Sequence, residues 1–282
     1  MKWGDTDLYC RDLVKRVAHD AYVISLFAPR EKRSAIWAIH AFNYEIAKIR
    51  ETVSEPMLGE IRIKWWLDTI EEIYHGKARH HQVVQGLVDA CKRFDLEKRE
   101  FQTLIKGRMT DLTNEPFRKI EDLCTYIDQT VTPLNRLILG VLTQTEAKNY
   151  DRPISAASIG YGISGLLRAA PYFFRQNRNF IPADLMSEVG LTERNLFSLR
   201  PSVELSKAIA RLGKIALLRL DEVLSVKISR NAYPAVLSAA QARWYLRRLD
   251  TFDYNPYVRE ISLPLPFHEV RLALKVLRRR WQ

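Results

Sequence analysis

The sequence predicts an all-α protein that forms one domain of about ten helices, residues 1–282. Apolar residues recur at three- and four-residue spacing in one segment after another, and no segment shows the sustained alternation of a half-buried strand. The 11 glycines and 12 prolines are few for a β protein built on tight turns. A hydrophobic content of 47% and a charged content of 27% exclude intrinsic disorder, because enough apolar surface is available to form a core.

Turn residues place the helices along the chain. Pro29 precedes a predicted helix over residues 30–50, and Pro56 begins another over 57–74, which Gly76 follows in a C-cap position. The apolar face of the first helix comprises Ile36, Ile39, Ala41, Phe42 and Ile46. Further helices are predicted near residues 97–112, 120–144, 154–172, 203–228, 233–250 and 267–281.

A glycine motif raises the possibility of a dinucleotide site. Gly160, Gly162 and Gly165 spell GxGxxG, and Asp184 lies 19 residues after the last of them. Such a site needs a buried strand immediately before the glycines, and residues 153–159 are too rich in small side chains to form one. The pattern therefore favours a helix whose small face lets another helix or a ligand approach closely.

Two pairs of carboxylates are spaced for one helix face. Asp68 with Glu72, and Asp184 with Glu188, stand four residues apart and could hold Mg²⁺, although such pairs are more typical of a solvated surface. The three cysteines are far apart and form neither a disulfide framework nor a zinc pattern. The N-terminal segment is acidic, unlike a signal or transit peptide, so the sequence predicts a cytoplasmic protein in a reducing compartment.

The net charge of +11 is concentrated near the C-terminus. Residues 201–282 hold 15 basic and 7 acidic residues, a net charge of +8, which predicts an anionic partner. Nucleic acid is not predicted, because no recognisable binding module accompanies the charge. No segment reaches the roughly 18–20 apolar residues that a membrane-spanning helix needs.

The C-terminal helix, residues 268–282, is predicted to be basic and amphipathic. Its apolar stripe comprises Val270, Leu274, Leu277 and Trp281, and the neighbouring cations include Arg278, Arg279 and Arg280. Such a helix either packs its stripe on the core or contacts an anionic membrane. Arg278, Arg279, Arg280 and Trp281 are the candidates for membrane contact.

Four separated blocks of sequence resemble the squalene/phytoene synthase family. These blocks are AIWAIHAFNYEIAKIRE (35–51), GEIRIKWWLDTIEEIY (59–74), SIGYGISGLLRAAPYFFRQNRNFIPADL (158–185) and YLRRLDTFDYNPY (245–257). Catalytic members join two prenyl diphosphates head to head. The resemblance implies an isoprenoid synthase helical fold with a central cavity, across which residues 35–51 and 158–174 face each other.

The residues at the family's catalytic positions differ from those of its enzymes. Two DxxxD motifs of the enzymes hold the Mg²⁺ ions that bind the diphosphate, and the resemblance maps their ends onto Ala47 and Glu51 and onto Ala169 and Phe173. Tyr44 stands where the family has a diphosphate-binding arginine. One carboxylate cannot assemble a metal cluster, so we expect no catalytic residue, no metal and no cofactor; Mg²⁺ would be needed only if activity were retained.

Four other residues remain candidates for anion or ligand binding: Arg168, Arg175, Arg178 and Tyr126. Guanidinium groups can contact an anion without a metal, although they can equally be solvated or paired with acids.

The departures resemble a non-catalytic branch of the family, which assists the assembly of respiratory complex I. The blocks that carry this resemblance are residues 53–66, 166–182 and 252–256. It implies complex I subunits or other assembly factors as partners, and a peripheral location on the bacterial inner membrane or on the matrix side of the mitochondrial one. The alternative is a prenyltransferase, or a binder of prenyl diphosphate or a related lipid.

Overall fold

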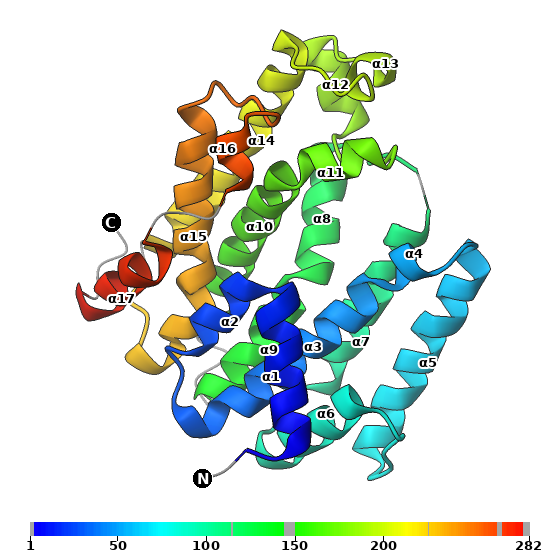
Figure 1. Cartoon of the computed structure of the whole chain (residues 1–282), viewed down its shortest axis with the longest axis vertical. Coiled ribbons are helices and arrows are strands. Elements are labelled where there is room, and N and C mark those ends of the chain that lie inside the picture. The colour runs from blue at the N-terminus through cyan, green and yellow to red at the C-terminus, as the bar shows by residue number, and fades with distance from the viewer. Residues whose placement is uncertain (1–2, 114, 144–149, 225, 264–266, 279–282) are drawn as a thin grey trace. The chain divides into compact units, whose positions relative to one another are not determined.

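The computed structural model (Figure 1) describes residues 3–113, 115–143, 150–224, 226–263 and 267–278. Every regular element in these ranges is helical, so the all-α prediction is confirmed. No helix of the described chain is long and apolar enough to cross a membrane. The helices are α1 (Asp5–Val17), α2 (His19–Ser25), η1 (Arg30–Lys32), α3 (Arg33–Ala47), α4 (Ile49–Thr52), α5 (Pro56–Tyr74), α6 (Gln82–Arg93), α7 (Lys98–Gly107), η2 (Arg108–Leu112), α8 (Ile120–Thr130), α9 (Thr132–Thr143), α10 (Asp151–Arg168), α11 (Ala170–Arg175), α12 (Ala183–Val189), α13 (Glu193–Leu196), α14 (Val203–Leu224), η4 (Arg230–Ala232), α15 (Tyr233–Asp250), α16 (Arg259–Ser262) and α17 (His268–Arg278).

The helices group into two compact units. Unit 1 comprises Met1–Thr113, Gln129–Ile154 and Ile228–Val236, and unit 2 comprises Asn114–Asp128, Ser155–Lys227 and Leu237–Gln282. Three of the five divisions fall within α8, α10 and α15, and the other two, after Thr113 and after Lys227, fall between helices. The first degenerate motif belongs to unit 1 and the second to unit 2, so a single domain with the two motifs facing across a cavity stays a prediction.

Helix α3 is the core of unit 1. The predicted apolar face is buried, and Ala35, Trp37 and Ala38 on its other sides are buried as well. A helical stretch that is buried on all sides, as residues 34–39 are, must be surrounded by other elements. Accordingly, α3 contacts α1, α6 and α9.

Aromatic rings and polar contacts fix α3 among its neighbours. The ring centroid of Phe42 lies 5.2 Å from that of Trp66 on α5 and 5.5 Å from that of Phe101 on α7, both in edge-to-face geometry. Just before α3, the Nζ atom of Lys32 donates a 2.7 Å hydrogen bond to the carbonyl of Leu142, near the end of α9. The side chain thereby binds one of the carbonyls that a helix end leaves without an intrahelical partner.

Prolines explain why the structure has more helices than the sequence predicts. The predicted helix over 120–144 is two helices, α8 and α9, and that over 154–172 is α10 followed by α11. Pro133 and Pro171 lack the N–H that would continue the preceding helix, but proline is tolerated in the first turn of the next one. Each boundary therefore falls one or two residues before a proline.

The glycines of GxGxxG lie inside α10, which excludes the buried strand that a dinucleotide site requires. A Cβ atom on Gly160 would lie 2.5 Å from Cγ of Leu220 on α14, and one on Gly162 would lie 2.3 Å from Cγ2 of Ile127 on α8. The helical interpretation is confirmed, because these glycines let α14 and α8 approach α10 closely.

Candidate functional site

The first degenerate motif lies at the end of α3. Ala47 is the last residue of this helix, and Glu51 is an exposed residue of the short helix α4, beyond a break at Lys48. The Nζ atom of Lys48 lies 4.9 Å from the centroid of the Tyr44 ring and 2.7 Å from a carboxylate oxygen of Glu45. The cation over the Tyr44 ring is therefore paired with Glu45 of α3.

The second degenerate motif surrounds the break between α10 and α11. Ala169 lies at the break, and the amide of Phe173 still donates a 3.1 Å hydrogen bond to its carbonyl, so both positions share one side of the turn. Asn177 adopts a left-handed conformation (φ 53°), and the amide of Arg178 donates to the carbonyl of Phe173. This arrangement is a Schellman motif, which ends α11 and directs the Arg178 side chain back toward the motif.

Two of the three candidate cations contact different aromatic residues. The guanidinium carbon of Arg168 lies 4.5 Å from the ring centroid of Tyr245, and that of Arg178 lies 5.1 Å from the ring centroid of Phe173. These are cation–π contacts, which a guanidinium makes readily.

Arg175 is exposed and acts electrostatically on Tyr257. Burial raises the pKa of Tyr257, and the positive charge of Arg175 opposes that rise. The hydroxyl of Tyr257 is buried, and no hydrogen-bond partner for it exists within the described residues. No pattern in the sequence singles out Tyr257. The remaining candidate, Tyr126 on α8, packs its ring 5.4 Å from that of Phe117.

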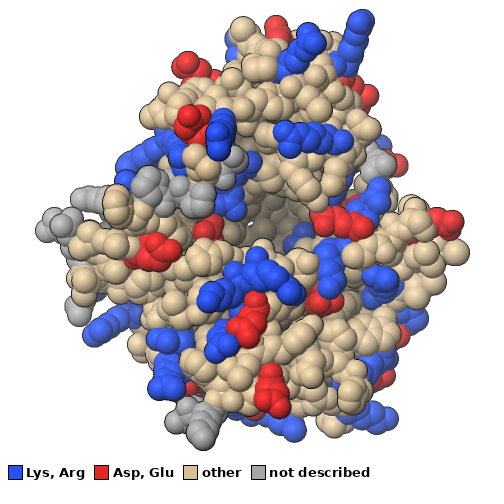
Figure 2. All heavy atoms as spheres, in the orientation of Figure 1, with Lys and Arg blue, Asp and Glu red and all other residues tan. Residues whose placement is uncertain are grey.

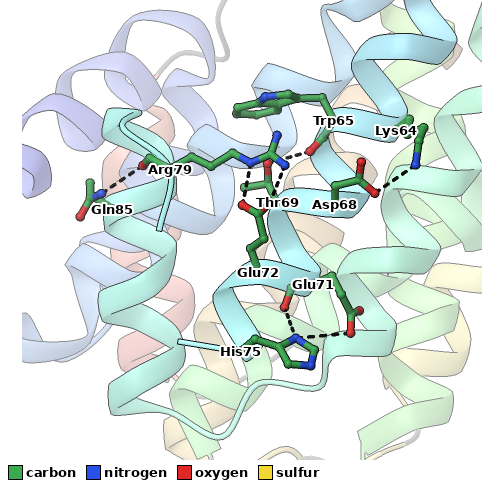
Figure 3. A network of polar contacts seen from close by, with 9 residues as sticks. All are labelled: Lys64, Trp65, Asp68, Thr69, Glu71, Glu72, His75, Arg79 and Gln85. Atoms are coloured by element: carbon green, nitrogen blue, oxygen red, sulfur yellow. Dashed lines mark hydrogen bonds and ion pairs between the residues drawn. The ribbon is translucent and has the colours of Figure 1, made fainter. Parts of the chain in front are cut away.

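The carboxylates of α5 form a surface network rather than a metal site (Figure 3). Glu72 accepts two 2.7 Å hydrogen bonds from Arg79, whose guanidinium also lies over the Trp65 ring, and Asp68 pairs with Lys64 at 3.3 Å. The hydrogen bonds from Arg79 hold the pKa of Glu72 below its usual value. In the part of the chain that is described, no three His, Cys, Asp or Glu side chains are grouped to hold a metal ion.

The apolar stripe of the C-terminal helix is exposed. On α17, Val270, Leu274 and Leu277 have exposed fractions of 55%, 42% and 76%, whereas His268 and Leu272 on the opposite side are buried. Of the two interpretations left open by the sequence, the structure therefore excludes packing of these three side chains on the core. Arg279, Arg280 and Trp281, and the side chain of Arg278, lie outside the described residues.

Cations gather where α17 meets α15. Arg243 on α15 forms an ion pair with Asp221 on α14, and its Nε atom is buried without a hydrogen-bond partner among the described residues. Burial, together with the charges of Arg243 and Arg247, lowers the pKa of Lys275 on α17. On the face shown in Figure 2, by contrast, Lys and Arg lie in small groups with Asp and Glu between them.

Comparison with known proteins identifies the family of the chain. Residues 14–275 match the family model of squalene/phytoene synthase. The chain is 29% identical over 273 residues to human "NADH dehydrogenase (ubiquinone) complex I, assembly factor 6", which covers 94% of this chain and 81% of that protein. The bovine protein of the same name is 28% identical, covering 98% and 83%. Chloroplastic phytoene synthase 2 of Oryza sativa is 22% identical, covering 96% and 72%.

Solved structures show the same fold. A dehydrosqualene synthase in complex with ligand superposes with a TM-score of 0.85 at 16% identity, covering 97% of this chain and 96% of that one. Squalene synthase from Alicyclobacillus acidocaldarius gives a TM-score of 0.78 at 20% identity, covering 89% and 95%. The helices thus adopt the isoprenoid synthase fold that the resemblance implied, and with the family model matched over 262 residues, the chain belongs to the squalene/phytoene synthase family.

Proposed function

We propose that this protein assists the assembly of respiratory complex I and does not condense prenyl diphosphates. The proposal depends on one observation, the lack of carboxylates at three of the four motif positions, which are occupied by Ala47, Ala169 and Phe173. The relatives named assembly factor 6 support it, since two of them match more than nine-tenths of this chain at 28–29% identity.

Chemistry gives the reason why these side chains matter. Diphosphate is a poor leaving group until a divalent metal neutralises the charge that develops as the bond breaks. Mg²⁺ is usually held by carboxylates, together with water and phosphate oxygens. Here Glu51 is the one acid at the four mapped positions, and Phe173 is covered by Arg178. The site is therefore unsuited to the metal-dependent reaction.

Deletion of the gene tests this function directly. We expect native gels of membranes from the deletion strain to lose at least nine-tenths of the assembled complex I, whereas its squalene and carotenoid levels stay unchanged. Wild-type protein supplied in trans should restore the complex. Intact complex I together with a changed squalene or carotenoid profile would contradict the proposal and favour an enzyme.

A second candidate function is metal-independent binding of a prenyl diphosphate or related lipid. It is favoured by the buried hydroxyl of Tyr257, which lacks a partner within the described chain and lies in the field of Arg175. A buried hydroxyl without a hydrogen-bond partner destabilises the fold, and a hydrogen bond to a ligand oxygen would recover that free energy. Binding of this kind is compatible with a role in assembly.

We further propose peripheral contact with an anionic membrane, on the cytoplasmic side in bacteria or the matrix side in mitochondria. The exposed stripe of α17 supports this, because an amphipathic helix with Leu on one face and cations beside it is typical of an interfacial helix. Each cation near an anionic bilayer contributes about 1 kcal/mol.

Salt-sensitive co-sedimentation with anionic vesicles is therefore expected. Replacing Leu274 and Leu277 with Ser should weaken binding several-fold, and so should replacing Arg278, Arg279 and Arg280 with Glu. Met57→Ser with Ile61→Ser is a matched control, because these side chains on α5 are 61% and 59% exposed. If wild type and the triple arginine variant co-sediment equally at low salt, the basic tail is an ordinary solvated surface.

A further inference from the structure

The outward face of α14 carries three cations in a row. Lys207, Arg211 and Lys214 are exposed and stand at i, i+4 and i+7, so they lie on one side of the helix. Together with Glu188 and Val189 at the end of α12, they line an open hollow of about 350 Å³. This volume lies within the range of about 300–1,000 Å³ that is usual for small-molecule sites. The opposite side of α14 packs into unit 2 through Leu205, Ala208, Ile209, Leu212, Ala216 and Leu220.

The charged side chains of this hollow are not joined by direct ion pairs in the described structure. Within the described residues, none of the three cations makes a hydrogen bond or an ion pair, and Glu188 makes none either. Like charges at these spacings repel one another weakly, and Glu204, three residues before Lys207, offsets part of that repulsion. A bound anion would remove the repulsion, because phosphate oxygens accept hydrogen bonds from several Lys and Arg donors at once.

Glu188 restricts the anion to a particular class. A bare phosphate among the cations would be repelled by this carboxylate, which is on the wall of the same hollow. A ligand that carries a hydrogen-bond donor beside its phosphate would instead satisfy Glu188. We propose that the hollow between α12 and α14 binds a phosphate ester whose alcohol portion carries a hydroxyl or an ammonium group.

Such an ester can come from a soluble metabolite or from a phospholipid headgroup. Val203 and Leu218 lie on the same side of α14, one turn beyond the cations at either end, and are 64% and 66% exposed. They would contact the bilayer if the headgroup of a lipid entered the hollow. The site is independent of any role in complex I assembly, so its test can fail while that function stands.

Calorimetric titration of the full chain tests the site with three probes: glycerol 3-phosphate, phosphoethanolamine and inorganic phosphate. We expect at least one ester to bind five-fold or more tightly than inorganic phosphate. The variant with Lys207→Gln, Arg211→Gln and Lys214→Gln should lose at least ten-fold in ester affinity. A control with Arg16→Gln, Lys77→Gln and Lys106→Gln removes three exposed cations of unit 1 and should leave the affinity unchanged. Equal losses in both variants, or no ester binding by wild type, would overturn the proposal.

Glu188→Gln separates a ligand-selecting role from a structural one. Removing the carboxylate should raise the affinity for inorganic phosphate several-fold and abolish the preference for the ester. The circular dichroism spectrum should not change. An unchanged preference would overturn the assigned role of Glu188 and with it the ester class.

Vesicles identify the source of the ester. We expect vesicles of phosphatidylcholine with phosphatidylglycerol to bind wild type more tightly than the Val203→Ser, Leu218→Ser variant if the ligand is a headgroup. Equal vesicle binding with retained affinity for glycerol 3-phosphate would uphold the site and assign it to a soluble ester.

Discussion

Purified protein incubated with farnesyl or geranylgeranyl diphosphate and Mg²⁺ is expected to release no diphosphate above background. The reason is the lack of carboxylates at the motif positions: Ala47, Ala169 and Phe173 offer no side-chain oxygen ligand, and the side chain of Glu51 is exposed. Enzymes accelerate reactions by roughly 10⁶-fold or more, and in this reaction the acceleration depends on the metal that stabilises the leaving diphosphate. Loss of the metal site should therefore remove nearly all measurable turnover. The measurement is a coupled diphosphate assay with product extraction.

An active squalene or phytoene synthase assayed in parallel serves as the positive control. Turnover that EDTA abolishes would contradict the pseudoenzyme interpretation, because it would require a metal site built from other residues. Binding of farnesyl diphosphate that EDTA leaves unchanged would instead support metal-independent ligand binding. In that case Tyr257→Phe and Arg175→Gln should each weaken binding.

Much of the fold can be predicted from local sequence, and the helices that the prediction misses were missed for physical reasons. The predicted helix over 233–250 has the bounds of α15, and Gly76, with φ 77°, follows α5 in the C-cap arrangement that its position predicts. The short helices α12, α13 and α16 span only four to seven residues. Periodicity needs a window of about 11–18 residues, so it cannot define elements of this length.

The site is less predictable than the fold because periodicity shows which residues share a face but not what covers that face. Leu274 and Leu277 form the expected stripe on α17, but only the structure shows that Leu272, on another side, is the buried residue. The cations of α14 share a face at i, i+4 and i+7, a signal already present in the sequence. That Glu188 lines the same hollow depends on packing of α12 against α14, which no local pattern encodes.

Phe42→Ala is expected to lower the free energy of unfolding by about 3–5 kcal/mol, a large share of the stability of a typical domain. The side chain is fully buried between Trp66 and Phe101, so its removal forfeits apolar burial and leaves a cavity in the core of unit 1. Phe267→Ala is the matched control, since this ring is 77% exposed and its removal should change stability by less than about 0.5 kcal/mol.

Urea unfolding followed by circular dichroism and by tryptophan fluorescence measures both effects and also tests the predicted single domain. If the chain is one cooperative domain, both probes report one transition, and Phe42→Ala moves that transition to lower urea. The equivalent change in unit 2, Phe174→Ala, should move the same transition, because this ring is also buried, against Phe180. Two transitions, each moved by only one of the substitutions, would show that units 1 and 2 unfold independently, since a cavity destabilises only the cooperative unit that contains it.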